Sequence, residues 1–378
     1  GKAVSATLPF RNISTSRFAL NWLAHMAYPT VVMESLVSRE LQVIDAKWST
    51  PQLLEALLRA LTGDGPALST APLSSSVDPE IALVVTTSGS TGNPKAVALS
   101  AKALIANARA THQFIGAKIG DRWSLLLPTT HIAGLNILIR SIELGTIPVS
   151  VDNTADFTAI VPTQLHRALT ADTKLFSHLK GCQAILVGGA PLSEETRNLA
   201  TARGLNIITT YGATETCGGV IYDGVPLNGA EFKLIDGRIA LKGPQLANGY
   251  LGGEFPIEDG WFLTSDHGEI NNGKLVVLGR IDDQIISGGE KISLSAVESY
   301  LQSEFANQEI VAFAKADPEW GEKLCIATTA ALSIEAVASK LKTKFGSHAS
   351  PKEVHTVSNI PYLSIGKPDR KRLANDFA

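Results

Sequence analysis

The chain contains little cysteine and no long apolar run. Three cysteines occur among 378 residues (Cys182, Cys217 and Cys325), and none has the Cys-x-x-Cys or Cys/His spacing of a metal site. A disulfide framework or a zinc site is therefore not expected, and the composition favours a reducing cytoplasm. No stretch approaches the roughly 18 uninterrupted apolar residues that a membrane helix needs, so no membrane association is expected.

Charge is also sparse. Charged residues make up 18% of the chain and the formal net charge is −3, whereas about 25% is typical of globular proteins. This balance argues against a nucleic-acid binder that neutralises phosphates, and the 44% hydrophobic content argues against disorder. At roughly 150 residues per domain, the length predicts two domains of a compact enzyme.

Short β-rich runs alternate with helical patterns in the first two thirds of the chain, which predicts an α/β domain. We expect a loop over 67–79. Strands are expected at Ile81–Val85, Ser124–Leu127, Ala159–Val161, Ala184–Val187 and Asn206–Thr209, and helices at Ala101–His112 and Glu194–Ala202. From Phe232 onward, turn pairs such as Asp236–Gly237, Asp259–Gly260 and Asn272–Gly273 predict β-hairpins. The last hundred residues are of mixed α+β character, and a domain boundary is expected near Arg280–Asp283.

The segment Thr86–Lys95 combines hydroxyl side chains, two glycines and one lysine after an apolar strand. Glycine lets the backbone turn tightly, hydroxyl and N–H groups donate to phosphate oxygens, and lysine adds positive charge. The spacing differs from a Walker A loop, and no Gly-x-Gly-x-x-Gly fingerprint occurs. We interpret the segment as a phosphate-binding loop between a strand and a helix; a flexible linker is the alternative.

Thr87–Lys95 resembles the Thr-Ser-Gly-Ser/Thr-Thr-Gly-x-Pro-Lys loop of the ANL adenylate-forming enzymes. This family comprises acyl-CoA synthetases, nonribosomal peptide adenylation domains and luciferases. Tyr211–Glu215 resembles the family's Tyr-Gly-x-Thr-Glu element, in which the tyrosine lies by adenine, the threonine meets the α-phosphate and the glutamate holds Mg²⁺. Gly188–Pro191 resembles the Gly-Gly-Ala/Ser-Pro turn near adenine and the acyl group, and we expect Pro191 to open a helix.

Further matches follow in the family's order. Trp261–Asp266 resembles Trp-Phe-x-Thr-Gly-Asp, with Ser265 in place of glycine, and implies that Asp266 binds the ribose hydroxyls. Leu278–Gly289 resembles the hinge region. The resemblance implies that Arg280 reaches the ribose or phosphate, that Asp282 is the hinge, and that Gly288 and Gly289 meet CoA in the thiolation state.

The C-terminal stretch Pro361–Leu373 resembles the family's terminal Pro-x-x-x-x-Gly-Lys-x-x-Arg-x-x-Leu motif. Lys367 corresponds to the catalytic lysine that bridges the carboxylate and the α-phosphate. Pro368 departs from the β-branched residue that is usual there, and because proline lacks an N–H group, the local strand pairing is uncertain. An unremarkable surface lysine is the alternative reading of Lys367 taken alone.

The resemblance covers about residues 80–378. It implies an α/β fold with a large N-terminal adenylation domain over 1–281, its N-terminal subdomain truncated, and a small, mobile α+β C-terminal domain over 282–378. The implied ligands are ATP, Mg²⁺ on Glu215, and CoA as co-substrate. The residues assigned to ATP or AMP are Thr87, Ser88, Gly89, Ser90, Thr91, Gly92, Lys95, Gly188, Gly189, Ala190, Pro191, Thr210, Tyr211, Gly212, Thr214, Asp266 and Arg280; those assigned to catalysis are Lys367, Thr214, Glu215 and His131.

The short length and the segment Leu127–Arg140 resemble the compact carboxylate–CoA ligases of menaquinone biosynthesis, which occur especially in actinobacteria. The implied substrate is an aromatic acid that carries a ketone and a second carboxylate. The residues assigned to its acyl site are His131, Gly134, Leu135, Arg140, Gly189 and Gly212. Arg140 is a candidate partner for the second carboxylate. Alternatively, Arg140 is a helix-end arginine paired with Glu143 or a backbone carbonyl. The alternative interpretation of His131 is a histidine of the core.

Other activities stay open. A ligase for another aryl or medium-chain acid would share every motif above. An amino-acid adenylation domain is less favoured, because no carrier domain follows in the sequence. A catalytically silent acyl-adenylate-binding protein is disfavoured, because Glu215, Asp266 and Lys367 are all present. Small-molecule partners are expected, with no nucleic acid and no membrane, and a homodimer stays open.

Overall fold

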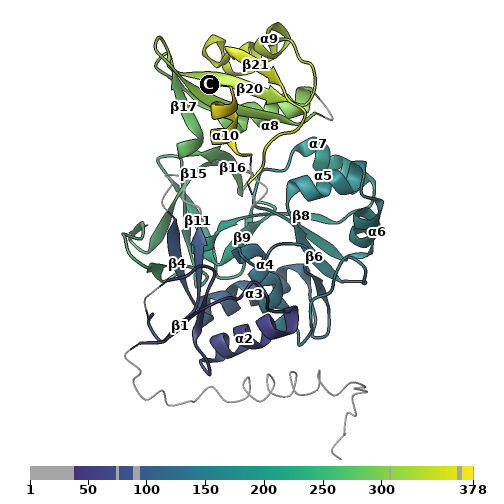
Figure 1. Cartoon of the computed structure of the whole chain (residues 1–378), viewed down its shortest axis with the longest axis vertical. Coiled ribbons are helices and arrows are strands. Elements are labelled where there is room, and N and C mark those ends of the chain that lie inside the picture. The colour runs from purple at the N-terminus through teal and green to yellow at the C-terminus, as the bar shows by residue number, and fades with distance from the viewer. Residues whose placement is uncertain (1–37, 74–75, 88–93, 306–307, 364–367, 378) are drawn as a thin grey trace, which may run out of the picture.

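The structure is a computed structural model that describes residues 38–73, 76–87, 94–305, 308–363 and 368–377, without the side chain of Asp282. A larger part at the bottom of Figure 1 contains three sheets, and a smaller C-terminal unit with a fourth sheet lies at the top. Within the described residues, no helix is both long enough and apolar enough to cross a membrane.

The first two sheets form the main layers of the larger part. The first has the order β1 (Leu41–Val43), β2 (Ala67–Ser69), β3 (Ile81–Thr87), β4 (Lys95–Ser100) and β13 (Gly249–Tyr250). The second has the order β10 (Val225–Pro226), β9 (Gly218–Tyr222), β8 (Ile207–Ala213), β7 (Ala184–Val187), β6 (Phe157–Ile160) and β5 (Trp123–Ser124). Strands β5 to β8 are parallel, as the alternating pattern of strands and helices predicts.

The third sheet is antiparallel and built from hairpins. It contains β11 (Glu231–Ile235), β12 (Arg238–Lys242), β14 (Ile257–Glu258), β15 (Trp261–Asn271) and β16 (Lys274–Arg280). The predicted turn pairs connect β11 to β12, β14 to β15, and β15 to β16. Asp236, Asp259 and Asn272 have positive φ angles of 49–50°, and the glycine after each is also left-handed. These turns confirm the hairpin prediction, because Asp-Gly and Asn-Gly pairs tolerate two consecutive left-handed residues.

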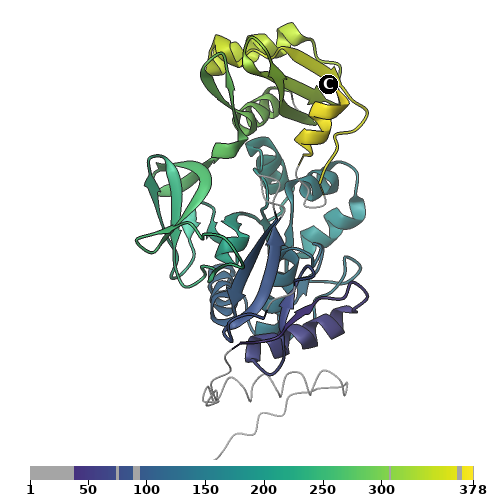
Figure 2. The same cartoon turned by 60° about the vertical axis from the view of Figure 1, so that its left-hand side comes forward.

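Helices cover the sheets of the larger part (Figures 1 and 2). They are α2 (Thr50–Thr62), α3 (Ala101–Ile115), α4 (Ile132–Glu143), α5 (Pro162–Thr170), α6 (Thr173–Gly181) and α7 (Glu194–Ala202), with a 3₁₀ turn η1 (Thr214–Thr216). Helix α3 shows local control of its ends. The Ser100 side chain accepts a hydrogen bond from the Ala103 N–H, and Gly116 ends the helix at a φ of 72°.

Helix α4 is buried on nearly every side, although it carries Asn136, Arg140 and Glu143, and it lies between the first two sheets. Leu135 and Leu138 pack into one core cluster with α2, α3, β3 and β4, whereas Ile137 packs into another with Trp123 and Phe157 of the second sheet. The core therefore fixes the position of α4, which carries the predicted acyl-site residues.

The C-terminal unit begins after the 3₁₀ turn η2 (Ile281–Asp283). Its sheet has the order β18 (Glu290–Ser293), β17 (Gln284–Ser287), β20 (Gly321–Thr328) and β19 (Ile310–Asp317), with β21 (Glu353–Thr356) paired to β20; its helices are α8 (Leu294–Glu304), α9 (Ile334–Phe345), η3 (Ser347–Ala349) and α10 (Arg370–Asp376). Its two core clusters contain only residues from Ile285 onward. The boundary between residues 281 and 282 stays a prediction that this separation of cores supports.

Three local predictions were wrong. Residues 67–69 form the buried strand β2 rather than part of a loop. The segment after β3 leads into a second strand, β4, and not directly into a helix, because the apolar run Ala96–Leu99 is buried between β3 and β13. A short apolar run without periodicity does not distinguish a strand from a helix. Pro191 does not open a helix, since α7 begins at Glu194 and is capped by Ser193.

Candidate active site

The predicted phosphate loop is closed by the ends of β3 and β4. Thr87 and Lys95 are directly opposed in the antiparallel register, and the Thr87 hydroxyl donates to the Lys95 carbonyl over 3.4 Å. Ser88, Gly89, Ser90, Thr91 and Gly92 lie outside the described residues. The Lys95 ammonium lies 4.7 Å from the centre of the Tyr250 ring, within cation–π distance. The pairing of Thr87 with Lys95 therefore holds the two described ends of the loop next to each other.

Glu215 lies next to this hairpin base. It belongs to η1, and its Oε1 accepts a hydrogen bond of 2.8 Å from the Tyr250 hydroxyl. Strand β13 places Tyr250 there by pairing with Val97 of β4. The Glu215 carbonyl also accepts from the Ala247 N–H over 2.8 Å. Lys95, Tyr250 and Glu215 thus form one continuous group around the base of the loop.

A magnesium ion suits this group. Mg²⁺ keeps several waters and usually binds through one or two carboxylates together with substrate phosphates. Glu215 offers one half-buried carboxylate, and its Oε2 has no hydrogen-bond partner among the described residues. The described part of the chain contains no cluster of three or more His, Cys, Asp or Glu residues that could hold a metal by itself. The donor set fits a metal that arrives with a phosphorylated substrate.

Tyr250 is a functional candidate that the sequence motifs did not assign to the site. Its phenol orients Glu215, and its ring faces Lys95. Burial, followed by the neighbouring Glu215 carboxylate, raises the pKa of Tyr250, so the phenol remains a hydrogen-bond donor at neutral pH. No local pattern pairs two residues that are 35 positions apart.

We expect Tyr250→Phe to weaken nucleotide activation without unfolding the protein. The ring and its packing would remain, and only the hydrogen bond to Glu215 would be lost. Such a bond to a charged group contributes about 1.5–3 kcal/mol. The half-saturating Mg²⁺ concentration in ATP–pyrophosphate exchange should rise about tenfold or more, with the melting temperature nearly unchanged. An unchanged Mg²⁺ dependence would show that Tyr250 does not orient the carboxylate.

Tyr211 and Asp266 form a second polar group. The Tyr211 hydroxyl donates to Asp266 Oδ2 over 2.7 Å. Asp266 lies in β15 directly opposite Arg280 of β16, and its N–H donates to the Thr264 hydroxyl over 3.1 Å. Burial, and then the Asp266 carboxylate, raises the pKa of Tyr211, which keeps its hydroxyl protonated. The structure therefore brings together three residues that the sequence assigned to the nucleoside.

The glycines near these groups allow neighbouring strands to pack closely. A Cβ on Gly188 would lie 2.2 Å from the Thr210 hydroxyl oxygen, and one on Gly212 would lie 2.1 Å from the Gly218 carbonyl oxygen. Gly189 has a φ of 81°. These positions exclude larger residues because β7, β8 and β9 approach closely, so their glycines do not by themselves identify a ligand contact. Ala190 and Pro191 follow in the loop before α7.

Predicted acyl-site residues lie at the start of α4. His131 is the N-cap residue and is half-buried, and burial lowers the pKa of its imidazole, which favours the neutral form. A Cβ on Gly134 would lie 2.2 Å from the Pro128 carbonyl oxygen, so glycine permits the turn before the helix to pack on it. Leu135 is fully buried in the core, and its place in the acyl site stays a prediction.

Arg140 is buried without a carboxylate partner among the described residues. Its Nη2 donates to Asn107 Oδ1, the Thr111 hydroxyl and the Tyr222 hydroxyl over 3.3–3.5 Å, and its guanidinium lies 5.0 Å from the Trp123 ring centre. Its Nε has no hydrogen-bond partner. The alternative of pairing with Glu143 was wrong, since Glu143 pairs with Arg109 over 2.6 Å.

This environment is costly for a cation. Burial lowers the pKa of Arg140, and only the Tyr222 hydroxyl opposes that effect. Long hydrogen bonds to neutral groups and one unsatisfied Nε do not compensate for the loss of hydration. A buried guanidinium of this kind is suited to an anion that is supplied by a ligand.

Gly288 and Gly289 form the two-residue turn between β17 and β18. Their φ angles are 60° and 85°, and Ser287 pairs with Glu290 across the turn. The glycine pair is thus required by the hairpin itself, and a CoA contact stays a prediction. Asp282 lies in η2, and Lys367 lies outside the described residues.

A layered α/β domain followed by a smaller α+β unit is the architecture of an adenylate-forming enzyme. The chain belongs to the family of AMP-binding enzymes, whose model matches residues 21–251. The match includes the hairpin, Tyr211–Glu215 and Tyr250, and it ends before Asp266.

Curated relatives within this family match from about two thirds to most of the chain. The chain is 36% identical to a probable 2-succinylbenzoate–CoA ligase of Mycobacterium tuberculosis, over 89% of this chain and 97% of that protein. It is 32% identical to the 2-succinylbenzoate–CoA ligase of Escherichia coli, over 63% of this chain and 56% of that protein.

Solved structures share the fold. One is an o-succinylbenzoate CoA synthetase from Bacillus subtilis in complex with its acyl-adenylate intermediate, with a TM-score of 0.70, 22% identity, and coverage of 95% of this chain and 91% of that chain. Another is an ATP-bound MatB from Rhodopseudomonas palustris, with a TM-score of 0.72, 19% identity, and coverage of 96% and 92%. The predicted fold class, a large α/β domain with a small α+β domain, is confirmed.

Proposed function

We propose that the enzyme is an ATP-dependent carboxylate–CoA ligase that converts o-succinylbenzoate, ATP and CoA to o-succinylbenzoyl-CoA, AMP and diphosphate. The proposal is supported by a relative that is 36% identical over 89% of this chain and is named a probable 2-succinylbenzoate–CoA ligase. The structural observation that carries the choice of acid is Arg140, a buried guanidinium without a carboxylate partner among the described residues. Of the two carboxylates of o-succinylbenzoate, one would be activated and the other would neutralise Arg140.

Adenylation requires charge compensation, because a carboxylate must attack a negatively charged α-phosphate. Lys95 and the hydroxyl and N–H groups of residues 87–92 would bind the phosphates, with Thr214 at the α-phosphate. Lys367 would lie between the carboxylate and the α-phosphate and stabilise the charge of the transition state. Glu215, oriented by Tyr250, would hold Mg²⁺, which supplies further positive charge to the phosphates when bound.

The nucleoside would be held by residues from three strands. Tyr211 would lie by adenine and Asp266 would accept hydrogen bonds from the ribose hydroxyls, with Arg280 beside them. The hydrogen bond between Tyr211 and Asp266 fixes the position of both side chains. Gly188, Gly189, Ala190, Pro191, Thr210 and Gly212 would form the wall near adenine.

The acyl group would lie along the start of α4. Gly189 and Gly212 would border the reacting carboxylate, while His131, Gly134 and Leu135 would border the aromatic ring. A neutral His131 donates or accepts a hydrogen bond without placing a second cation beside Lys367. Arg140 lies nine positions beyond His131, about two and a half turns along α4. In this proposal it would receive the far carboxylate, directly or through one water.

Thioester formation would use a different arrangement of the C-terminal domain. The CoA thiol must reach the acyl adenylate while water stays excluded. Rotation about Asp282 would withdraw Lys367 and bring the Gly288–Gly289 turn toward the adenylate. Separate cores on the two sides of η2 support such a rigid-body motion.

We expect Asp282→Pro to separate the two half-reactions. Proline fixes φ near −65° and removes the freedom of this residue to act as a hinge. Adenylate formation should persist, while thioester formation should fall by about tenfold or more. Asp282→Ala is the matched control, because alanine keeps the backbone free. Equal loss of both half-reactions in the proline variant would argue against the hinge.

The proposed function is tested by product analysis. Incubation with o-succinylbenzoate, ATP, Mg²⁺ and CoA should yield the CoA thioester and AMP in equal amounts. Formation of ADP instead of AMP, or accumulation of a bound adenylate with no thioester on addition of CoA, would overturn it; the second result would favour a silent adenylate-binding protein.

We propose a cytoplasmic location and small-molecule partners. The three cysteines are free and buried, and burial raises the pKa of Cys182 and Cys325 to about 12. Unpaired thiols of this kind suit a reducing compartment.

A further inference from the structure

Helix α10 begins just after the predicted catalytic lysine. On the two sides of residues 363–367, the chain is held together: the Asp369 N–H donates to the Pro361 carbonyl over 2.8 Å, and Tyr362 and Pro368 form an antiparallel bridge. The Tyr362 hydroxyl donates to Glu309 over 3.3 Å. The described residues on the two sides of this segment, Tyr362 and Pro368, are therefore held next to each other on the C-terminal unit.

Arg370 attaches the residues that follow this segment to the rest of the C-terminal unit. It is the first residue of α10, and its guanidinium contacts three other segments. Nη2 binds both carboxylate oxygens of Glu298 in α8 over 2.8 and 2.9 Å, Nη1 binds Asp283 Oδ1 over 2.6 Å, and Nε donates to the Ala312 carbonyl over 2.8 Å. We call Arg370, Glu298, Asp283 and the Ala312 backbone the Arg370 clamp.

The clamp is shielded from solvent. The Glu298 and Asp283 side chains are 13% and 14% exposed. Glu298 Oε1 also accepts from the Ala312 N–H over 2.8 Å. Burial raises the pKa of Glu298 to about 7, although Arg370 opposes this effect. Removal of the guanidinium would leave two nearby buried carboxyl groups without this common partner, which is far less favourable than the loss of an exposed ion pair.

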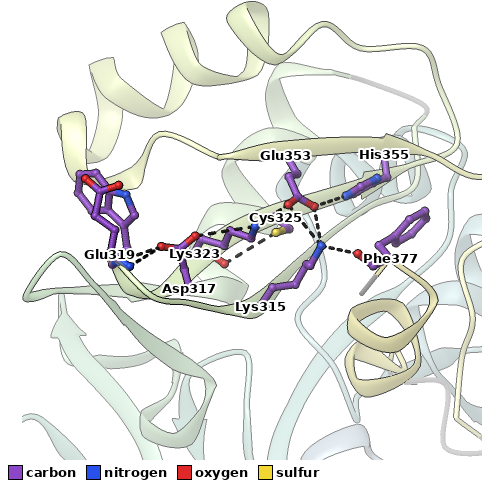
Figure 3. A network of polar contacts seen from close by, with 9 residues as sticks. Lys315, Asp317, Glu319, Lys323, Cys325, Glu353, His355 and Phe377 are labelled. Atoms are coloured by element: carbon purple, nitrogen blue, oxygen red, sulfur yellow. Dashed lines mark hydrogen bonds and ion pairs between the residues drawn. The ribbon is translucent and has the colours of Figure 1, made fainter.

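The other end of α10 is fixed as well (Figure 3). The Phe377 carbonyl accepts a hydrogen bond from the Lys315 ammonium, which also binds Glu353 Oε2 over 2.9 Å. The Phe377 ring stacks on His355 at a centroid distance of 3.9 Å. Burial alone would raise the pKa of Glu353, but hydrogen bonds from Lys323, Lys315 and His355 outweigh it and lower the pKa to about 2. Helix α10 is thus attached at both ends to the sheet of the C-terminal unit.

Only the first of these attachments reaches the predicted hinge. Asp283 is the residue after Asp282, and both lie in η2, the link between β16 and β17. Figure 1 shows α10 in the lower part of the C-terminal unit, where the Arg370–Glu298 ion pair joins it to α8. One guanidinium therefore joins the residue just beyond the pivot to the base of the segment that carries Lys367, although the two are 87 positions apart in sequence.

We propose that Arg370 is a positioning residue for the adenylation half-reaction: the Arg370 clamp couples the orientation of the hinge to the placement of Lys367. The inference rests on the proposed function, in which Lys367 acts on the α-phosphate. A side chain that stabilises a transition state must be placed to within a fraction of an ångström, and a shift of about 1 Å costs up to about a hundredfold in rate.

The thioester half-reaction makes no use of this coupling. In the proposed function it depends on the Gly288–Gly289 turn, which belongs to the β17–β18 hairpin. That hairpin is fixed by its own strand pairing, by the bond from the Gly288 N–H to the Trp320 carbonyl and by packing of Gly288 against the Trp320 ring. None of these contacts includes a member of the Arg370 clamp.

The test compares Arg370→Gln, Asp283→Asn and Glu298→Gln with Arg372→Gln in the full-length enzyme. Arg372 is the matched control, because it lies in α10, its side chain is 67% exposed, and it forms a long ion pair of 3.6 Å with Asp376 of the same helix. Adenylation is measured by single-turnover formation of acyl adenylate, and thiolation by the reaction of supplied acyl adenylate with CoA. Melting temperatures are recorded for every variant.

We expect Arg370→Gln to slow adenylation by about ten- to a hundredfold at saturating substrates, with KM for ATP and acid changed by less than about threefold. Thiolation should stay within about twofold of the wild type. Asp283→Asn keeps the shape of the side chain and should show the same selectivity to a smaller degree, even if Arg370→Gln folds poorly. Arg372→Gln should match the wild type.

Equal losses in both half-reactions, or losses that follow the melting temperature alone, would overturn the inference and leave the clamp a purely structural feature. Wild-type enzyme that forms no adenylate with o-succinylbenzoate would instead contradict the proposed function. In that case the same comparison of variants is made with whichever acid the wild-type enzyme activates, so the two failures are distinguishable.

Discussion

Replacing Lys367 by alanine should slow adenylate formation by about 10²–10³-fold, the effect typical of removing one group that stabilises transition-state charge. The ammonium would contact the carboxylate and the α-phosphate mainly while the bond between them forms. The loss should therefore fall on the maximal rate and not on KM for ATP. Thioester formation from supplied acyl adenylate should change by less than about threefold, since Lys367 would be withdrawn in that step.

Lys371→Ala supplies the control for this experiment. Lys371 is an exposed residue of α10, so its removal changes the net charge equally without altering the proposed site. Pre-steady-state measurement of diphosphate release separates the adenylation rate from later steps. A Lys367→Ala enzyme that forms adenylate at the wild-type rate would show that the resemblance of the C-terminal motif does not extend to its chemistry.

Replacing Arg140 by alanine should lower kcat/KM for o-succinylbenzoate by about 10- to 100-fold, because a hydrogen bond to a charged group contributes about 1.5–3 kcal/mol. Most of the effect should appear in KM, since the second carboxylate is distant from the reacting one and is bound equally in the ground and transition states. Arg140→Lys keeps the charge but loses the planar fork, and it should show an intermediate loss.

The effect of Arg140 is best isolated with an acid that lacks the second carboxylate. Such an acid would be a poor substrate for the wild-type enzyme, and Arg140→Ala should change its kcat/KM by less than about threefold. This comparison stays informative even if the variant is less stable, because both acids are tested on the same protein. An equal loss for both acids, or an unchanged KM for o-succinylbenzoate, would mean that Arg140 only packs against Trp123 and Tyr222.

Much of the fold could be predicted from the sequence where local physics decides it. The Asp-Gly and Asn-Gly turns of the third sheet need two left-handed residues, and their positions were predicted correctly. Strand β7 and helix α7 have the predicted bounds, since each has a clear apolar run or a capping residue at its ends. Strand β4 was interpreted as part of the loop before the helix at Ala101, because its burial depends on pairing with β13, which is distant in the sequence.

In the candidate site, too, short motifs predicted some residues, whereas contacts between distant segments could not be predicted. Tyr211, Asp266 and Arg280 were assigned from short motifs, and the structure brings them together on β8, β15 and β16. Their individual roles stay predictions. Tyr250 and the Arg370 clamp were not foreseen, because each acts through a contact between distant segments. Arg140 was singled out in the sequence, but only the structure shows that its partners among the described residues are neutral.

The central claim is that this enzyme activates o-succinylbenzoate as an adenylate before transfer to CoA. ATP–pyrophosphate exchange, measured without CoA across a panel of aryl, medium-chain and amino acids, tests it most directly. We predict rapid exchange with o-succinylbenzoate, weak or no exchange with acids that lack the second carboxylate, and loss of exchange in Lys367→Ala. Faster exchange with another acid would contradict the choice of substrate, and no exchange with any acid would contradict the proposed activity itself.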